Sequence, residues 1–206
     1  MHDLFIQNFL KTFIAVDPIS LIPILTIITR GLNTKKTIRL ALLVFLISSS
    51  VLTFFSLYGN SFLNFMGISV SSFKIVGGLF LLIISYEMVF EKRLKRKKLM
   101  ADDFMNEQDL RSLAVFPISI PLVAGPSAIT LSVLISQNMN FSIVNFYIQI
   151  FPLILTLFLT SLVIVFSSFF IQIFNKTIMN VLQKIFGLIL GALAVEYIIK
   201  GSLDLI

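Results

Sequence analysis

The sequence predicts an all-α integral membrane protein with six transmembrane helices, and three observations lead to this fold class. Hydrophobic residues make up 57% of the 206-residue chain, 22 residues are Phe, and only 13% are charged. A soluble domain of this size could not bury so much apolar surface. The apolar residues also form long continuous runs, and the basic residues gather between alternate runs. Together these features indicate a chain that crosses a lipid bilayer several times.

About 20 apolar residues are needed to cross the hydrocarbon core of a bilayer. Six runs approach or exceed this length, and we expect them to be the spans: 4–28, 40–58, 71–90, 113–135, 142–174 and 180–199. The fifth run is longer than one span needs, so we expect its ends to extend beyond the hydrocarbon or its helix to tilt. We expect the first run to be retained as a span, because it lacks the small-residue cleavage site of a leader. The whole of 1–206 should form one membrane domain.

The basic residues predict how the chain is oriented. Lys and Arg occur in the connections 29–39, 91–112 and 175–179, whereas the second and fourth connections contain neither. Positively charged connections remain in the cytoplasm. We therefore expect these three connections to be cytoplasmic and both termini to lie outside. The net charge of +6 then reflects topology, and no nucleic-acid partner is expected.

The connection 91–112 is the one sizeable polar segment between the predicted spans. It opens with the basic run KRLKRKK at 92–98 and ends in an acidic stretch that contains Asp102, Asp103, Glu107 and Asp109. One interpretation is a site for anionic lipid or a partner. We interpret the segment instead as a solvated linker whose lysines set the topology.

Two of the predicted spans contain proline at a point that should break the helix. In the first span, Asp17 precedes Pro18, which lacks an N–H group and disfavours helical geometry in the residue before it. The helix should end near Asp17 and restart at Pro18, a favoured first-turn position. Pro126 marks a similar break in the fourth span. A carboxylate at such a depth is costly unless it lines a cavity or is buried in protein.

The two breaks belong to an internal repeat. AVDPIS at 15–20 aligns with VAGPSA at 123–128 with an offset of 108 residues, and GLFLLIISYEM at 78–88 aligns with GLILGALAVEY at 187–197 with an offset of 109. A duplicated unit of three spans must enter the membrane in opposite directions. We therefore expect two inverted three-helix repeats, about 1–90 and 113–206, with helices 1 and 4 broken near the midplane. Interrupted spans at corresponding positions indicate the substrate site of a transporter.

The chemistry of the breaks suits a small zwitterion. A helix that restarts exposes unpaired amides and the positive end of its dipole, which can bind a carboxylate. Such amides are expected near Ile19 and Ser20 and near Ser127, and Asp17 adds the opposite charge, suited to an ammonium group. Asp17 also fits the N-cap of its own helix. The sequence leaves open whether Asp17 is a cap, a ligand or both.

Spans 3 and 6 carry small residues and one acidic residue each. The glycines indicate close helix packing: Gly77, Gly78, Gly187 and Gly191. Glu87 and Glu196 come late in the same spans, close to polar flanks. We interpret them as interfacial anchors, with a proton relay as the alternative.

Enzymatic chemistry has little support in the sequence. The chain has no Cys, its one His is His2, and motifs such as HExxH, G-x-S-x-G and the Walker lysine loop are absent. We expect neither an enzyme nor a metal or cofactor site, and no ATP-driven transport within this chain.

Several motifs resemble those of a known family: DPISLIPI at 17–24, IPLVAGPSAI at 120–129, the Gly pair of span 3 and FGLILGALAVEYIIKG at 186–201. Across nearly its full length the chain resembles the MarC family of bacterial inner-membrane proteins. The resemblance implies an inner-membrane location, inverted repeats and kinship with six-span neutral amino acid transporters of the SnatA type. It also implies substrate binding at the unwound parts of spans 1 and 4, by Asp17, Pro18, Ile19, Ser20, Ala124, Gly125, Pro126 and Ser127.

Two residues depart from the family pattern. Ser20 and Ser127 stand where Gly is usual, in DPIG and AGPG, and each adds a hydroxyl group beside the expected site. The hydroxyl groups either narrow the cavity or supply hydrogen bonds to a solute.

The sequence therefore predicts a secondary transporter of a small neutral solute, best an amino acid, that works by alternating access. Two alternatives stay open, a membrane protein with an assembly or regulatory role and a passive channel. The sequence does not decide between H⁺ and Na⁺ coupling, between uptake and export, or whether the chain forms a homo-oligomer.

Overall fold

A computed structural model describes residues 2–102, 109–136 and 142–205 of the chain. Within these ranges the regular structure is helical throughout. The elements in chain order are α1 (His2–Val16), α2 (Pro18–Thr29), α3 (Thr34–Phe65), α4 (Val70–Val89), α5 (Lys92–Asp102), α6 (Leu110–Leu113), the wide-turned segment η1 (Ala114–Val123), α7 (Pro126–Ile135), α8 (Ile143–Asn145), η2 (Phe146–Ile150), α9 (Phe151–Val165), α10 (Ser167–Ile173) and α11 (Lys176–Leu203).

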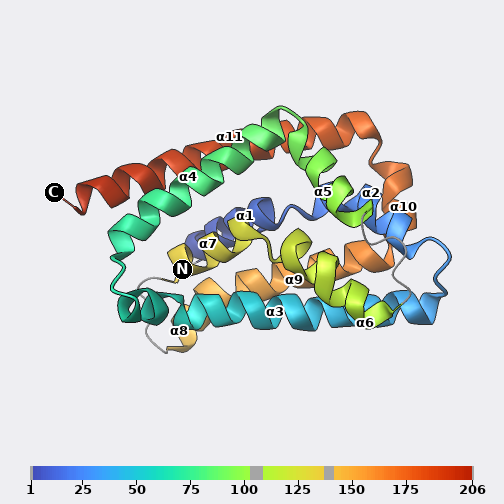
Figure 1. Ribbon diagram of the computed structural model, residues 1–206, viewed down its shortest axis with the longest axis horizontal. Helices are drawn as coiled ribbons and strands as arrows, with labels where there is room; N and C mark the ends of the chain where they lie inside the picture. Colours follow the sequence, from blue (N-terminus) through green and yellow to red (C-terminus); the bar gives the residue numbers. More distant parts are fainter. Residues whose placement is uncertain (1, 103–108, 137–141, 206) are drawn as a thin grey trace.

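The long helices form two packed groups around the first span. Figure 1 shows α3 along one edge and the α4–α11 pair along the opposite edge, with α1, α7 and α9 between them. One core cluster joins the start of α2 to α3, η1, α7 and α9, and a second joins α1 to α4 and α11. Many large apolar side chains remain exposed on the outer faces of the helices. Such a surface is suited to contact with lipid tails.

The helices confirm an all-helical membrane protein with four to six candidate spans. Four are single segments, at Thr34–Phe65, Val70–Val89, Ile143–Val165 and Lys176–Leu203. Two more arise if each bent pair counts as one span, since α1 meets α2 at 42° and Leu110–Val123 meets α7 at 63°. The fifth predicted run, 142–174, is not one helix. Its helical geometry is interrupted at Phe166, and α10 forms a separate short helix after it.

Both predicted helix breaks are confirmed. The first helix ends at Val16, Asp17 takes a left-handed backbone conformation with φ of 58°, and α2 begins at Pro18. Asp is among the few residues other than Gly that adopt this conformation readily. In the second break, α7 begins at Pro126 directly after Gly125. Proline thus starts the second helix in each pair, as its missing N–H group allows.

The approach to the second break is less regular than the sequence predicts. Within η1, Phe116 and Ile120 have extended backbone angles, and each is followed by proline in a cis peptide bond. A residue before proline is driven towards extended geometry. The fourth span therefore departs from α-helix well before Gly125, whereas the sequence indicated a single interruption.

The predicted close packing of spans 3 and 6 is confirmed. A Cβ atom added at Gly78 would lie 2.7 Å from the carbonyl oxygen of Ala194, and one added at Gly187 would lie 3.1 Å from that of Ser85. The Ser85 hydroxyl donates a hydrogen bond of 2.7 Å to the carbonyl of Gly187. Helices α4 and α11 therefore approach backbone to backbone, which small residues permit.

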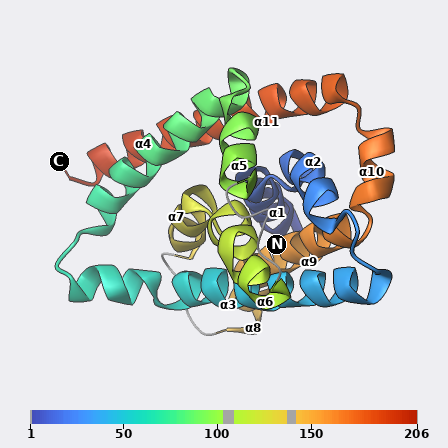
Figure 2. The same ribbon diagram turned by 45° about the vertical axis from the view of Figure 1, so that its right-hand side comes forward.

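The interpretation of 91–112 as a solvated linker is wrong for its first half, where Arg93 and Lys97 are buried. Residues Lys92–Asp102 form α5, which turns back from α4 and packs against α2 and η1 (Figure 2). Glu91 makes the turn with φ of 59°, and its carboxylate binds α11 through Lys184 Nζ at 3.0 Å and Asn180 Nδ2 at 3.0 Å. Asp109 caps α6. Asp103 and Glu107 lie outside the described residues.

We expect Gly78→Ala to lower the thermal unfolding temperature, even though Ala is the better helix former. The added Cβ would meet the carbonyl oxygen of Ala194 at 2.7 Å, and overpacking of this kind costs ~1–3 kcal/mol. The chain has no Trp, so circular dichroism is the suitable probe. Leu79→Ala, on the exposed neighbouring face of α4, is the control. If Gly78→Ala melts no earlier than the wild type, the close approach of α4 and α11 is incorrect.

Candidate functional site

The two helix breaks touch each other, although they lie more than 100 residues apart in the sequence. The Ser127 hydroxyl, in the first turn of α7, donates a hydrogen bond of 2.9 Å to the carbonyl of Ala15 near the end of α1. Both residues are buried. The broken segments of the first and fourth predicted spans therefore lie in contact.

Charged groups face both helix ends at the first break. The Ala15 carbonyl, at the negative end of the α1 dipole, also accepts a hydrogen bond of 3.0 Å from Nη2 of Arg93. At the positive end of α2, Oδ1 of Asp17 accepts the amide of Ser20 at 3.4 Å. The cap role of Asp17 is therefore confirmed.

Asp17 is neutralised by two cations from α5. Its Oδ2 lies 3.1 Å from Nε of Arg93 and 3.6 Å from Nζ of Lys97. The three residues are 0%, 3% and 5% exposed. Arg93 and Lys97 are one helical turn apart, so they share a face of α5. Lys97 Nζ also donates a hydrogen bond of 2.7 Å to the hydroxyl of Ser20. A solute ammonium group at Asp17 would have to compete with both cations.

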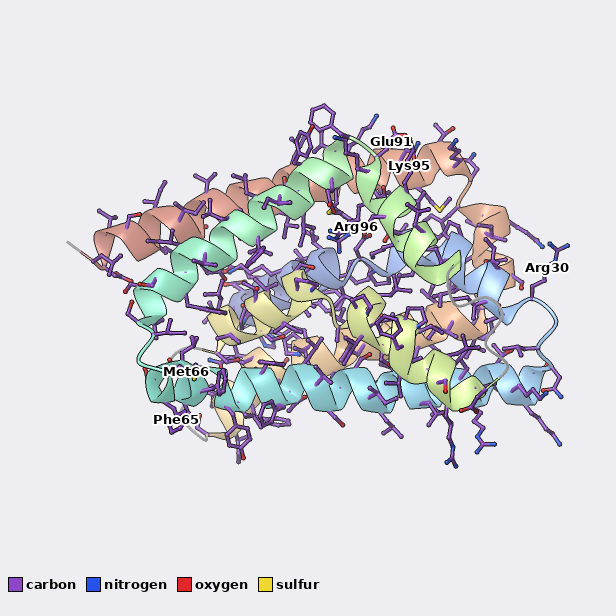
Figure 3. All side chains as sticks on the ribbon, viewed as in Figure 1. Arg30, Phe65, Met66, Glu91, Lys95 and Arg96 are labelled. Atoms are coloured by element: carbon purple, nitrogen blue, oxygen red, sulfur yellow. The ribbon has the colours of Figure 1, made fainter. Side chains whose placement is uncertain are left out.

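A third cation of α5 extends this charged face. Arg96 Nη1 forms an ion pair of 3.0 Å with Oε1 of Glu87 on α4. Figure 3 shows Arg96 turned towards the interior while Lys95 points outward. Glu87, interpreted as an interfacial anchor, therefore pairs with the basic face of α5. Glu196, at the corresponding position of α11, is exposed.

A cavity of about 90 Å³ lies between the two breaks and α5. A cavity needs ~10–15 Å³ by this measure, the space open to the centre of a water-sized sphere, to hold one water molecule, so this cavity has room for a small solute. Both spans and α5 contribute to its lining, which includes Ala15, Arg93, Lys97, Gly125, Pro126 and Ser127.

The eight predicted site residues divide into two groups. Gly125, Pro126 and Ser127 line the cavity. The other five surround the breaks but are not among its lining residues: Asp17, Pro18, Ile19, Ser20 and Ala124. All five are buried except Ile19, which is partly buried. The first break contributes the backbone and side chain of Ala15 instead.

The site holds a lysine that can exchange a proton near neutral pH. Lys97 lies on α5, outside the membrane-spanning segments. Burial lowers the pKa of Lys97 to about 7; attraction to Asp17 opposes this shift, and the charge of Arg93 adds to it. Burial also lowers the pKa of Arg93.

Sequence reasoning missed Arg93, Arg96 and Lys97. One signal was present, because a carboxylate buried in an apolar span needs a counter-charge. The sequence does not show which basic residue supplies it. Among the residues that the structure describes, no group of three or more His, Asp or Glu side chains could hold a metal ion.

We expect Asp17 and Arg93 to be strongly coupled in stability. Removing one partner of a buried ion pair costs ~3–5 kcal/mol, because the other charge stays buried without compensation. Asp17→Asn and Arg93→Met should each lower the melting temperature measured by circular dichroism, and the double variant should lose less than the sum. Lys95→Met, on the exposed face of α5, should melt like the wild type. Additive losses would show that the two side chains do not interact.

Comparisons with known proteins agree on one family. A family model described as MarC family integral membrane protein matches residues 2–206. A UPF0056 membrane protein of Methanocaldococcus jannaschii is 33% identical over 137 residues, which are 66% of this chain and 60% of that protein. A UPF0056 membrane protein of Buchnera aphidicola subsp. Schizaphis graminum is 36% identical over 131 residues, 62% of this chain and 58% of that protein. These matches span about three fifths of the relatives' length. No solved structure matches. The chain belongs to the MarC family of integral membrane proteins.

Proposed function

We propose that this protein is a secondary transporter of a small neutral solute, with an amino acid as the preferred candidate, and that it works by alternating access. The observation that carries the proposal is the meeting of two broken spans at a small cavity. Interrupted spans at corresponding positions of two halves are typical of transporter substrate sites. The names of the relatives state only that they are membrane proteins. The solute class therefore rests on the chemistry of the site.

The proposal includes two inverted repeats, about 1–90 and 113–206. Helix packing supports it, because each span contacts its counterpart in the other half: α1 with α7, α3 with α9, and α4 with α11. Pro18 and Pro126 also begin the second helices of the two bent pairs. Pairing of this kind is what a two-fold axis in the membrane plane would produce.

In this scheme the cavity walls are the two breaks and the gate is α5. The predicted site residues form or support the breaks, and the amides at the start of α7 face an anionic group of the solute. Opening the cavity on the α5 side requires Arg93 and Lys97 to leave Asp17. The volume of about 90 Å³ favours small solutes such as glycine, alanine and serine. We propose no metal or organic cofactor.

We expect saturable counterflow in proteoliposomes preloaded with glycine, alanine, serine or threonine. Ser127→Leu should reduce the rate about tenfold or more, because it enlarges a side chain that lines the cavity and removes the hydrogen bond to Ala15. Ser50→Leu is the matched control, since Ser50 lies on an exposed face of α3.

Flux that rises linearly with concentration would indicate a passive channel and contradict alternating access. Absence of exchange for the whole panel, with correctly folded protein, would contradict amino acid transport and favour an assembly or regulatory role.

We expect both termini outside the cell and the basic connections inside. Because the chain has no Cys, single cysteines can report this without a background signal. In whole cells, a membrane-impermeant maleimide should label His2→Cys and Leu205→Cys, and should label Lys35→Cys only after permeabilisation. Labelling of Lys35→Cys in intact cells would reverse the proposed orientation.

A further inference from the structure

The start of α7 is a helix amino end that its N-cap residue, Gly125, leaves without a side-chain cap. The helix has ten residues and begins after Gly125, with no side-chain hydrogen bond to its cap from the described residues. The amides of Ser127 and Ala128 fall in its first turn, where intrahelical partners are lacking. The corresponding end of α2 is capped by Asp17. The repeat thus has one helix start with a built-in carboxylate and one with glycine.

A buried guanidinium nitrogen provides a second and independent indication. Arg93 is 3% exposed and lines the same cavity as Gly125 and Ser127. Its Nε pairs with Asp17, and its Nη2 donates to the carbonyl of Ala15. Its Nη1 is buried and has no hydrogen-bond partner among the described residues. A buried N–H group without an acceptor is unfavourable, so this nitrogen favours an oxygen ligand in the cavity.

The charges around the cavity do not balance when Lys97 is protonated. Arg93 and Lys97 carry two positive charges against the single negative charge of Asp17. Arg96 and Glu87 neutralise one another. The described residues that line the cavity include no acidic side chain. One excess positive charge in a buried cluster is costly, and a single bound anion would remove it.

On the basis of the proposed transport function, we propose that Arg93 Nη1 and the first amides of α7 bind the carboxylate group of the solute, and that Lys97 carries a proton that accompanies it. Nη1 and the adjacent amides can donate to the two oxygens of a carboxylate, and two separate acceptor atoms are what a spherical anion such as chloride lacks. In this proposal the solute carboxylate caps the amino end of α7, as the carboxylate of Asp17 caps the amino end of α2.

The pH dependence follows from the groups that face Lys97. Asp17 acts on Lys97 from the first break, and Arg93 and Arg96 act on it from α5. Glu87 of α4 pairs with Arg96, while α2 and η1 have no ionisable residue. The pKa of Lys97 is about 7, and an added anion favours the charged form and raises this pKa. At a pH between the pKa of Lys97 in the free protein and its raised pKa in the complex, binding of the anion takes up one proton. The affinity for the anion therefore rises as the pH falls. Below pH 7 the lysine is already charged and affinity levels off.

The test is calorimetric titration of the purified protein with L-alanine and with L-alaninamide, which lacks the carboxylate. Paired buffers of different ionisation enthalpy report the protons taken up. We expect L-alanine to bind with uptake of about half a proton at pH 7, approaching one at pH 8, and Kd to rise about tenfold per pH unit above 7. L-Alaninamide should not bind, and sodium chloride should compete weakly.

Variants assign the two roles. Arg93→Lys keeps the positive charge but removes the planar guanidinium group and its Nη1, and it should weaken L-alanine binding about tenfold or more. Lys97→Met should bind without proton uptake and with a Kd that does not change with pH. Lys95→Met should behave like the wild type. The comparison of L-alanine with L-alaninamide needs only the wild type, so it remains decisive if a variant does not fold.

Equal binding of L-alaninamide, chloride binding as tight as that of L-alanine, proton uptake that persists in Lys97→Met, or no binding of L-alanine would overturn the proposal. The transport proposal fails separately. If the protein binds the carboxylate with proton uptake but shows no counterflow, this inference holds and the transport proposal fails. If alanine shows counterflow but binds without proton uptake, the transport proposal holds and this inference fails.

Discussion

The buried carboxylate of Asp17 is the constraint on which the centre of this structure depends. A charge with no solvent exposure, inside an apolar span, is stable only with close counter-charges. Arg93 and Lys97 supply them from α5, so the chain after α4 must turn back across the first break. Glu91 secures that turn to α11. This single acidic residue thus explains why Arg93 and Lys97 are buried inside the protein.

The two breaks differ in chemistry as well as in backbone, because Asp17 takes a left-handed conformation with φ of 58° whereas Gly125 is extended with φ of −83°. At the first break, the α1 carboxyl end meets Arg93 and the α2 amino end meets Asp17, so protein groups neutralise both dipoles. At the second break, glycine stands in the position of the carboxylate, and Gly125, Pro126 and Ser127 line the cavity. Both breaks are followed by a helix that begins with proline, Pro18 or Pro126. In the proposed scheme, the carboxylate of Asp17 at the start of α2 binds the gate helix α5. The start of α7, which has Gly125 in that position, binds the solute.

The contacts of the helices also suggest which parts of the protein are rigid and which can move. Helices α4 and α11 approach through glycines and a hydrogen bond between helices, which permits little relative movement. Helix α5, by contrast, is held at the site mainly by charge pairs, whose strength varies with protonation and with bound anions. Such contacts can exchange between partners as the occupancy of the cavity changes. In the proposed mechanism, the α4–α11 pair stays fixed, and α5 moves when the cavity binds or releases the solute.

The sequence alone determined the membrane class, the approximate positions of the candidate spans, both helix breaks and the close-packing glycines of α4 and α11. These features depend on local chemistry: apolar length, the missing N–H group of proline and the small size of glycine. The irregular path of η1, the division at Phe166 and above all the role of α5 required the tertiary structure. Within 92–98 all basic residues look equivalent in sequence, because helical spacing does not show which ones face a carboxylate about 80 residues away. Only the packing of α5 against the first break selects Arg93 and Lys97, since burial and charge pairing are properties of the folded chain.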